Sequence, residues 1–288
     1  MTSPAPDGGG TCLNILVLVK QVPNTQAIKI DPETNTLIRD GVESILNPYD
    51  SYALEAATRL KDKLASIKIS VLTMGPARAD VVLRECMAIS ADAAYLVTDR
   101  RFGGSDTLAT SYILSQAIRF VQAQEGRRFD LIFCGKQAID GDTGQVGPQV
   151  AELLDLPQVT SGLACELAGD ELLVVREMDD GTEKLALPLP GLVTFTKPNY
   201  SLRPPSARRK LAAKKLDITT ISADDLEGID RGRIGLKGSP TRVRKAYVPP
   251  AKTGGVIFSA QPIEESVRQL AQLLVDRDLV VNVEGDAP

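Results

Sequence analysis

Two segments of this chain combine glycine with hydroxyl and carboxylate side chains, residue types that bind phosphate groups. In the first, Gly103–Ser111, two glycines and a serine precede Asp106, Thr107 and Thr110. On a helix, Thr107 and Thr110 would lie one turn apart, so both hydroxyls could reach one phosphate group. The first turn of a helix also has free N–H groups and the positive end of the dipole, which favour an anion. The alternative is an ordinary N-cap with spare hydroxyls.

The second segment, Gly135–Gln149, is long, rich in glycine and aspartate, and follows an apolar run. It matches neither the GxGxxG nor the GxxxxGK[ST] fingerprint of nucleotide-binding loops. Its glycines let backbone amides approach a ligand closely, and Asp140 or Asp142 could accept a hydrogen bond from a ribose hydroxyl or cap a helix. Two anion-suited segments in one protein make a nucleotide site the leading hypothesis.

The elements that must position these segments alternate between apolar runs and helical periodicity. Apolar runs typical of buried strands cover 14–20, 67–74, 93–98, 130–135 and 192–196. Helical spacing predicts helices from Asn47–Asp50 to Leu60, with Asp50 as a capping residue, and over 77–89, 106–120 and 144–154. This alternation predicts a doubly wound, mainly parallel, Rossmann-like α/β sheet. The ligand crevice should lie beyond the carboxyl ends of the strands, where both segments and Met74-Gly75-Pro76 begin.

The pattern changes after Pro157. The turn Asp179-Asp180-Gly181 separates two apolar runs, 172–177 and 184–187, and predicts an added β-hairpin, and Ile28–Asp31 suggests a small edge hairpin. From Pro198 onward periodicity is lost until an amphipathic helix over 263–274.

We therefore expect a nucleotide-binding domain over residues 13–200 and an extended C-terminal docking arm over 201–288 that packs on another chain. The alternative for this arm is a loose surface tail. Residues 1–12, rich in proline, glycine and serine, are expected to be a disordered tail and not a signal peptide.

The composition argues against several kinds of chemistry. The chain of 288 residues has no histidine, which excludes Ser-His-Asp and Cys-His mechanisms within it. Its four cysteines form no CxxC pair, so we expect no metal site, and no residue is a convincing catalytic group. Free cysteines fit a reducing, cytoplasmic location. A net charge of -4 gives no indication of nucleic-acid binding, and no apolar run is long enough for membrane insertion.

Several blocks resemble the β subunit of electron-transfer flavoproteins, over essentially the whole length from Leu13. These blocks are Val19–Pro23, Asn47-Pro48, Met74–Pro76, Lys136–Asp140 and a long signature in Val174–Thr194, in the family's order. The resemblance implies a heterodimer with an α subunit that carries its own FAD. In ordinary members the β subunit holds structural AMP. In electron-bifurcating members a second FAD takes that place, accepts a hydride from NADH and splits the electron pair between high- and low-potential acceptors.

Three blocks look like the bifurcating type. Ordinary members resemble Asn-Gln-Thr where this chain has Gly144-Gln145-Val146, and Val146 lacks the threonine hydroxyl that helps to hold the AMP phosphate. The helix start at Asp106–Ser111 and the segment Leu236–Thr241 are also similar to bifurcating relatives. We therefore expect FAD, with AMP and a conventional electron shuttle as the alternative. A free-standing nucleotide sensor related to universal-stress folds is a third reading, against which the Val174–Thr194 signature argues.

The resemblance also indicates which residues hold the nucleotide. Leu18, Met74, Gly75 and Ala138 are expected to line the adenine and ribose, and Asn47 and Asp50 to hydrogen-bond the base. Thr107, Thr110, Gln145 and the amides near Val146 are expected to hold the pyrophosphate. The full expected set is Leu18, Asn47, Asp50, Met74, Gly75, Asp106, Thr107, Thr110, Gly135, Ala138, Asp140, Gly144, Gln145, Val146 and Gly147.

One block departs from the family. Only Lys197 stands between Thr196 and Pro198-Asn199-Tyr200, where many members have a longer loop ending in a similar Pro-Arg-Tyr. In relatives that use acyl-CoA dehydrogenases, this loop anchors the partner enzyme. Its shortening favours a different acceptor dehydrogenase or a larger redox complex.

Overall fold

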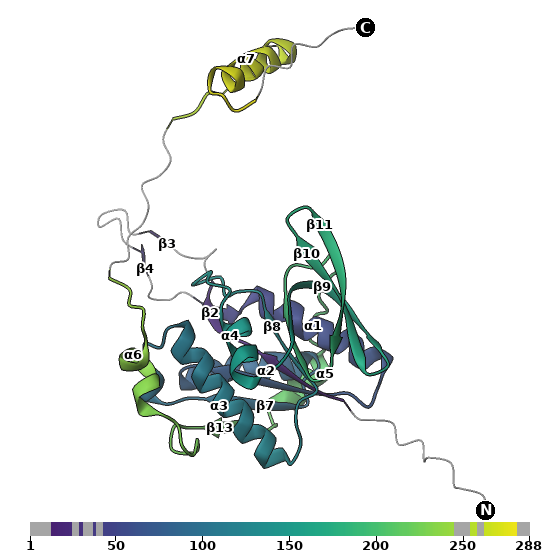
Figure 1. The fold of residues 1–288 in the computed structure, drawn as a ribbon, viewed down its shortest axis with the longest axis vertical. Coiled ribbons are helices and arrows are strands. Elements are labelled where there is room, and N and C mark those ends of the chain that lie inside the picture. Colours follow the sequence, from purple (N-terminus) through teal and green to yellow (C-terminus); the bar gives the residue numbers. More distant parts are fainter. Residues whose placement is uncertain are drawn as a thin grey trace, which may run out of the picture. The chain divides into compact units, whose positions relative to one another are not determined.

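The computed structural model describes residues 13–24, 29–30, 37–38, 43–244, 254–257 and 262–280 (Figure 1). The expected N-terminal tail, 1–12, lies outside these residues. The chain divides into two compact units, residues 1–246 and 247–288. The described part of the second unit contains one helix, α7 (Ile263–Asp276), which confirms the amphipathic helix predicted there.

A nine-stranded sheet forms the centre of the first unit, in the order β11-β10-β9-β12-β8-β1-β6-β7-β13. Neighbouring strands from β9 to β13 in this order are parallel, whereas β10 runs antiparallel to β9 and β11. The strands are β1 (Asn14–Leu18), β6 (Lys68–Met74), β7 (Ala93–Val97), β8 (Leu131–Gly135), β9 (Gln158–Ala168), β10 (Glu171–Met178), β11 (Gly181–Pro188), β12 (Gly191–Phe195) and β13 (Thr219–Ile221).

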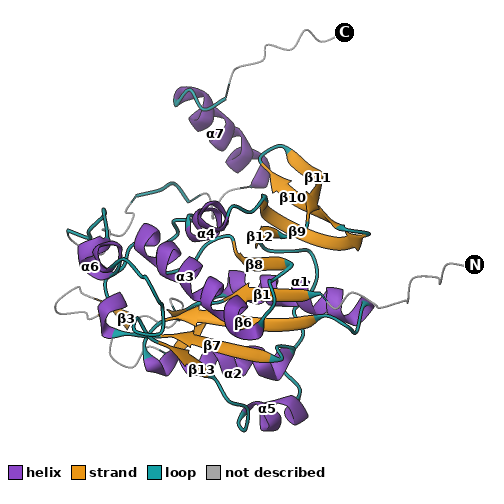
Figure 2. Ribbon diagram, turned by 60° about the horizontal axis from the view of Figure 1, so that its bottom comes forward, coloured by secondary structure: helices purple, strands orange, loops and turns teal. Residues whose placement is uncertain are grey.

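Helices cover both faces of this sheet (Figure 2), which is why its central strands are continuous apolar runs. On one face, α1 (Pro48–Lys63) and α2 (Asp80–Ile89) share a core cluster with Ile15 and Val17 of β1. On the other face, α3 (Thr107–Glu125) and α4 (Val146–Leu154) share a second cluster with Leu16 and Leu18. The predicted doubly wound, mainly parallel sheet is confirmed.

Two pairs of short antiparallel strands lie outside the main sheet. β2 (Gln21–Pro23) pairs with β5 (Ser44–Leu46), and β3 (Lys29–Ile30) pairs with β4 (Leu37–Ile38). The second pair confirms the small hairpin predicted near residue 30, although Ile28 and Asp31 lie outside the described residues.

The predicted hairpin of β10 and β11 is present, and β9 extends it to three strands. β9 has no counterpart among the strands predicted from the sequence. Its second half alternates between half-buried and exposed residues, so it shows no run of buried apolar side chains.

The segment after β12 contains regular structure that the sequence analysis left unassigned. It forms α5 (Ala207–Ala213), β13, a 3₁₀ turn η4 (Arg231–Arg233) and α6 (Gly235–Gly238). Arg84 of α2 donates to the carbonyl oxygens of Ala213 and Leu216, and Arg209 donates to those of Met87 and Ala91. Residues 201–244 thus belong to the first unit, whereas the sequence analysis placed the start of the arm at residue 201. Contacts of this kind leave no hydrophobic period in the sequence.

No helix in the described part of the chain is long and apolar enough to cross a membrane.

Candidate functional site

The carboxyl ends of β1 and β8 separate where the winding of the sheet reverses. Their pairing ends at Val17 and Phe133, after which Leu18 pairs with Leu72 of β6 and Gly135 pairs with Phe195 of β12. A reversal of this kind is the usual ligand site of a doubly wound sheet. Here it opens into a cavity of about 350 Å³.

Asp50, in the first turn of α1, connects the two separated strand ends. Its carboxylate accepts hydrogen bonds from the backbone N–H of Lys20 at 2.7 Å and of Gly135 at 3.0 Å. Burial raises the pKa of Asp50 to about 7, although hydrogen bonds from Asn47, Lys20 and Gly135 act to lower it. The predicted capping role of Asp50 is wrong, because its oxygens bond to the strand ends and α1 begins without a side-chain cap.

Asn47 and Lys20 hold the loop that follows β8. The Asn47 side chain donates to the carbonyl oxygen of Gln137 at 2.8 Å and accepts from the N–H of Ile139 at 3.2 Å. The Lys20 ammonium binds both carboxylate oxygens of Asp140, at 2.8 and 2.9 Å. Because the polar atoms of Asn47 and Asp50 are engaged within the protein, both residues shape the cavity. Their expected contact with a base stays a prediction.

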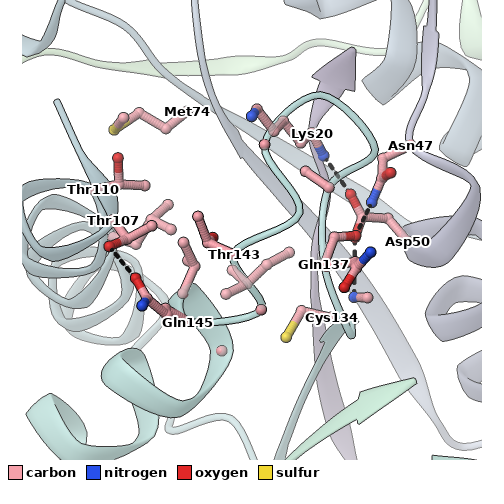
Figure 3. Close-up of a pocket in the computed structure, with 18 of the residues that line it drawn as sticks. Lys20, Asn47, Asp50, Met74, Thr107, Thr110, Cys134, Gln137, Thr143 and Gln145 are labelled. Carbon is pink, nitrogen blue, oxygen red and sulfur yellow. Dashed lines mark hydrogen bonds between the residues drawn. The ribbon is translucent and has the colours of Figure 1, made fainter. Parts of the chain in front are cut away.

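Two helix starts meet at the opposite side of the cavity (Figure 3). Asp106 caps α3 by accepting from the N–H of Ala109 at 3.0 Å, and the Thr107 hydroxyl donates to the side chain of Gln145 at 2.8 Å. Gln145 precedes α4, which has no side-chain cap. Free amides and the positive ends of two helix dipoles make this side of the cavity favourable for an anion.

Two glycines allow the elements around the cavity to pack closely. A Cβ on Gly147, in the first turn of α4, would lie 2.7 Å from the Thr194 methyl carbon and 2.8 Å from the Cys134 sulfur. A Cβ on Gly135 would lie 2.5 Å from a carboxylate oxygen of Asp50 and 2.6 Å from Cβ of Tyr49. Only glycine therefore lets α4 begin against β8 and lets Asp50 reach the end of that strand.

Gly135→Ala is expected to lower the free energy of unfolding by about 2–4 kcal/mol, because the new methyl group forces α1 away from β8. Urea unfolding followed by circular dichroism measures this loss. Gly141→Ala is the matched control in the same loop, since nothing lies within 4 Å of its added Cβ. Equal stability of the two variants would contradict the close packing of Asp50 on Gly135.

The cavity brings together all but two of the site residues expected from the sequence. Gly75 and Asp140 do not line it: Gly75 donates to the carbonyl oxygen of Val97 at the end of β7, and Asp140 is held by Lys20. Asp142, the alternative to Asp140 as an acceptor for a ribose hydroxyl, does line it. The lining residues that were not expected from the sequence are Val19, Lys20, Leu72, Ser105, Leu114, Cys134, Lys136, Gln137, Gly141 and Thr143.

Periodicity could have found some of the missed residues. Leu72 lies two positions before Met74 on a strand, and Leu114 lies four after Thr110 on a helix. These spacings place each pair on the same face of its element. The positions of Lys20 and Thr143 depend on loop geometry, for which the sequence has no such signal.

The chemistry of the lining fits a nucleotide. Leu18, Leu72, Met74 and Leu114 offer an apolar surface for a flat ring system, while the starts of α3 and α4 offer hydroxyl and amide donors for phosphate groups. No cluster of three or more His, Cys, Asp or Glu side chains that could hold a metal ion occurs in the described ranges.

Comparisons with known proteins agree with this geometry. The family model "Electron transfer flavoprotein domain" matches residues 34–226. The chain is 47% identical to "Electron transfer flavoprotein subunit beta" of Thermoanaerobacterium thermosaccharolyticum, over 93% of this chain and 100% of that protein. It is 42% identical to "Caffeyl-CoA reductase-Etf complex subunit CarD" of Acetobacterium woodii, with the same coverage.

A third relative has a different name. "Protein FixA" of Bradyrhizobium diazoefficiens is 41% identical, over 91% of this chain and 89% of that protein. The family match covers more than half of the chain, and the alignments with the first two relatives cover the full length of those proteins. The fold, the crevice and these similarities lead to one conclusion: this chain belongs to the electron transfer flavoprotein family, as a β subunit.

Proposed function

We propose that this chain acts in electron transfer as the β subunit of a heterodimer whose nucleotide site holds FAD, with NADH as the electron donor. When bound, the flavin would supply hydride acceptance from NADH and delivery of the electrons to separate high- and low-potential acceptors. The residues of this chain bind and orient the nucleotide and carry no acid–base chemistry.

One observation carries the choice of FAD over AMP. The starts of α3 and α4 meet through the bond between Thr107 and Gln145. Of these two helix starts, only that of α3 lines the cavity with hydroxyl groups, those of Thr107 and Thr110. Val146, at the start of α4, offers only its backbone amide to a phosphate. This distribution of donors suits a pyrophosphate that lies against α3, as the bifurcating type of the family requires.

Two observations support the proposed protein partners: the exposed apolar residues of α7 in the second unit and the names of the relatives. α7 exposes Ile263, Val267 and Leu270, and an α subunit is the partner that we expect to cover such an amphipathic helix. CarD is by its name a subunit of a reductase–Etf complex. By analogy, an acceptor dehydrogenase or a larger redox complex is the expected electron acceptor. The short connection at Lys197 argues against a conventional acyl-CoA dehydrogenase, and the proposed location is cytoplasmic.

Cofactor content tests this proposal. The complex with the α subunit is purified and denatured, and the released FAD and AMP are quantified. The expected result is two FAD and no AMP for each heterodimer. One FAD and one AMP would instead mean a conventional electron shuttle and would overturn the proposed role of Val146 and the Thr107/Thr110 pair.

A further inference from the structure

The segment Ile234–Thr241 is fastened to the loop that begins α3. The backbone N–H of Gly235 donates to the Ser105 hydroxyl and that of Leu236 donates to the carbonyl oxygen of Gly103, each at 3.1 Å. The N–H of Asp106 donates to the hydroxyl of Ser239 at 2.8 Å. Ser105 and Asp106 both line the nucleotide cavity. A segment more than 100 residues away in the sequence is therefore part of the support of this site.

Asp106 divides its carboxylate between this segment and α3. One oxygen caps α3 through the N–H of Ala109 at 3.0 Å. The other accepts from both the N–H and the hydroxyl of Thr241, each at 2.9 Å. Burial opposes the charge on Asp106, but the hydrogen bonds from Ala109 and Thr241 outweigh it, so the pKa of Asp106 is lowered. The capping group of α3 is thus held from outside the cavity by Thr241.

Glycine packing fixes the position of this segment. Gly104, with φ +76°, lies where a Cβ would be 3.1 Å from Cβ of Leu236. Gly235, with φ +63°, lies where a Cβ would be 2.2 Å from the carbonyl oxygen of Arg101. The contact is therefore close on both sides, and a shift of the segment would move the start of α3.

We infer that Thr241 is a positioning residue for the phosphate end of the nucleotide, acting through Asp106, and that nucleotide binding and docking of residues 235–241 stabilise each other. The inference rests on the proposed function only in that the cavity binds a nucleotide, and it applies to FAD and to AMP because both carry phosphate. The second unit begins at Tyr247, so the docked segment lies just before the boundary between the units.

The electrostatic reason is the charge of Asp106 beside an anion site. Two donors from Thr241 offset part of the negative charge of the Asp106 carboxylate and hold it in the capping position. Without them, the carboxylate is free to rotate, the cap of α3 weakens, and a bound phosphate meets a less screened negative charge. Because the coupling is thermodynamic, a bound nucleotide must strengthen the docking as much as the docking strengthens binding.

The test compares Thr241→Val, which removes the hydroxyl, with Thr241→Ser, which keeps it. FAD and AMP are titrated into the heterodimer after its cofactor at this site has been removed. Thr241→Val should weaken the binding of the nucleotide that the wild type accepts by about tenfold, and Thr241→Ser should restore most of it. Thr182→Val, on the exposed strand β11, is the matched control and should bind like the wild type.

Hydrogen exchange is a second measurement, and its nucleotide-dependent change would be unaffected if Thr241 had only a structural role. Nucleotide should slow the exchange of amides in residues 235–241 of the wild type, and this protection should shrink in Thr241→Val. Wild-type affinity in Thr241→Val, or equal weakening in the Ser and Val variants, would overturn the inference. Tight binding of AMP alone would overturn the proposed FAD site and leave the inference standing, whereas binding of neither nucleotide would overturn both.

Discussion

The double variant Thr107→Val/Thr110→Val is expected to lose the nucleotide of this chain, with affinity lowered about hundredfold or more. Valine keeps the shape of threonine but removes both hydroxyl donors from the start of α3. A hydrogen bond to a charged group contributes about 1.5–3 kcal/mol, so two such bonds to phosphate correspond to at least this change in affinity. The change also leaves Gln145 without its partner across the junction of α3 and α4.

The measurement is the flavin content of the purified heterodimer, with the α-subunit flavin as the internal standard. The variant should retain about one FAD for each heterodimer where the wild type has two. Thr107→Ser/Thr110→Ser is the control, because it keeps both hydroxyls and should keep both flavins. Unchanged occupancy in the valine variant would show that the phosphate groups lie elsewhere in the cavity.

Asp50→Asn is expected to change the pH dependence of stability. Burial raises the pKa of Asp50 to about 7 in the folded chain, from the ordinary value of 3.8 in the unfolded chain. Between these values the folded state holds a proton that the unfolded state has lost. The stabilisation is therefore complete below pH 4 and is lost as the pH rises through 7. The free energy of unfolding falls by about 1.4 kcal/mol for each pH unit within this window. Through Asp50, the wild type should therefore lose about 2–3 kcal/mol of its free energy of unfolding between pH 5 and pH 8.

Asparagine does not titrate, so the difference between the wild type and Asp50→Asn isolates this contribution. The variant should be less stable than the wild type at pH 5, because its amide accepts from only one of the two N–H groups. This gap, the difference in the free energy of unfolding between the two proteins, should narrow toward pH 8. The groups facing Asp50 do not obscure the effect: Lys20 is paired with Asp140, and burial raises the pKa of Cys86 and Cys134.

Urea unfolding at several pH values between 5 and 8 measures this gap. Asp62→Asn is the control, because the hydrogen bond from Arg203 lowers the pKa of Asp62, which therefore titrates below this range. Its difference from the wild type should be constant across the series. A constant gap for Asp50→Asn as well would mean that Asp50 is ionised throughout and that burial does not control it.

Local patterns in the sequence were sufficient for the central architecture. Apolar runs such as 14–20 and 130–135 predict buried strands, because a strand covered by helices on both faces must be apolar on both. The spacing of Thr107 and Thr110 predicts two hydroxyls at one helix start, and the structure places both in the cavity. These features depend on neighbours along the chain, and periodicity records them directly.

Long-range hydrogen bonds account for what the sequence reasoning missed. The local sequence pattern predicts Asp50 as a helix cap, but in the structure its carboxylate accepts hydrogen bonds from the backbone amides of Lys20 and Gly135 at the strand ends. Likewise, α5 is held by guanidinium–carbonyl hydrogen bonds, and β13 is held by pairing with β7 at the edge of the sheet. Because these contacts do not require a regular spacing of apolar residues, α5 and β13 show little apolar periodicity in the sequence.

The sequence by itself determined the doubly wound sheet, the two glycine-rich segments at its strand ends and most of the residues that line the cavity. Only the tertiary structure decided that Asp50 joins the separated strands, that Lys20 holds Asp140 and that Thr241 holds Asp106. The physical reason is that these contacts join residues 30, 85, 120 and 135 positions apart. A hydrogen bond across such a separation depends on how the layers pack and leaves no spacing that can be read along the chain.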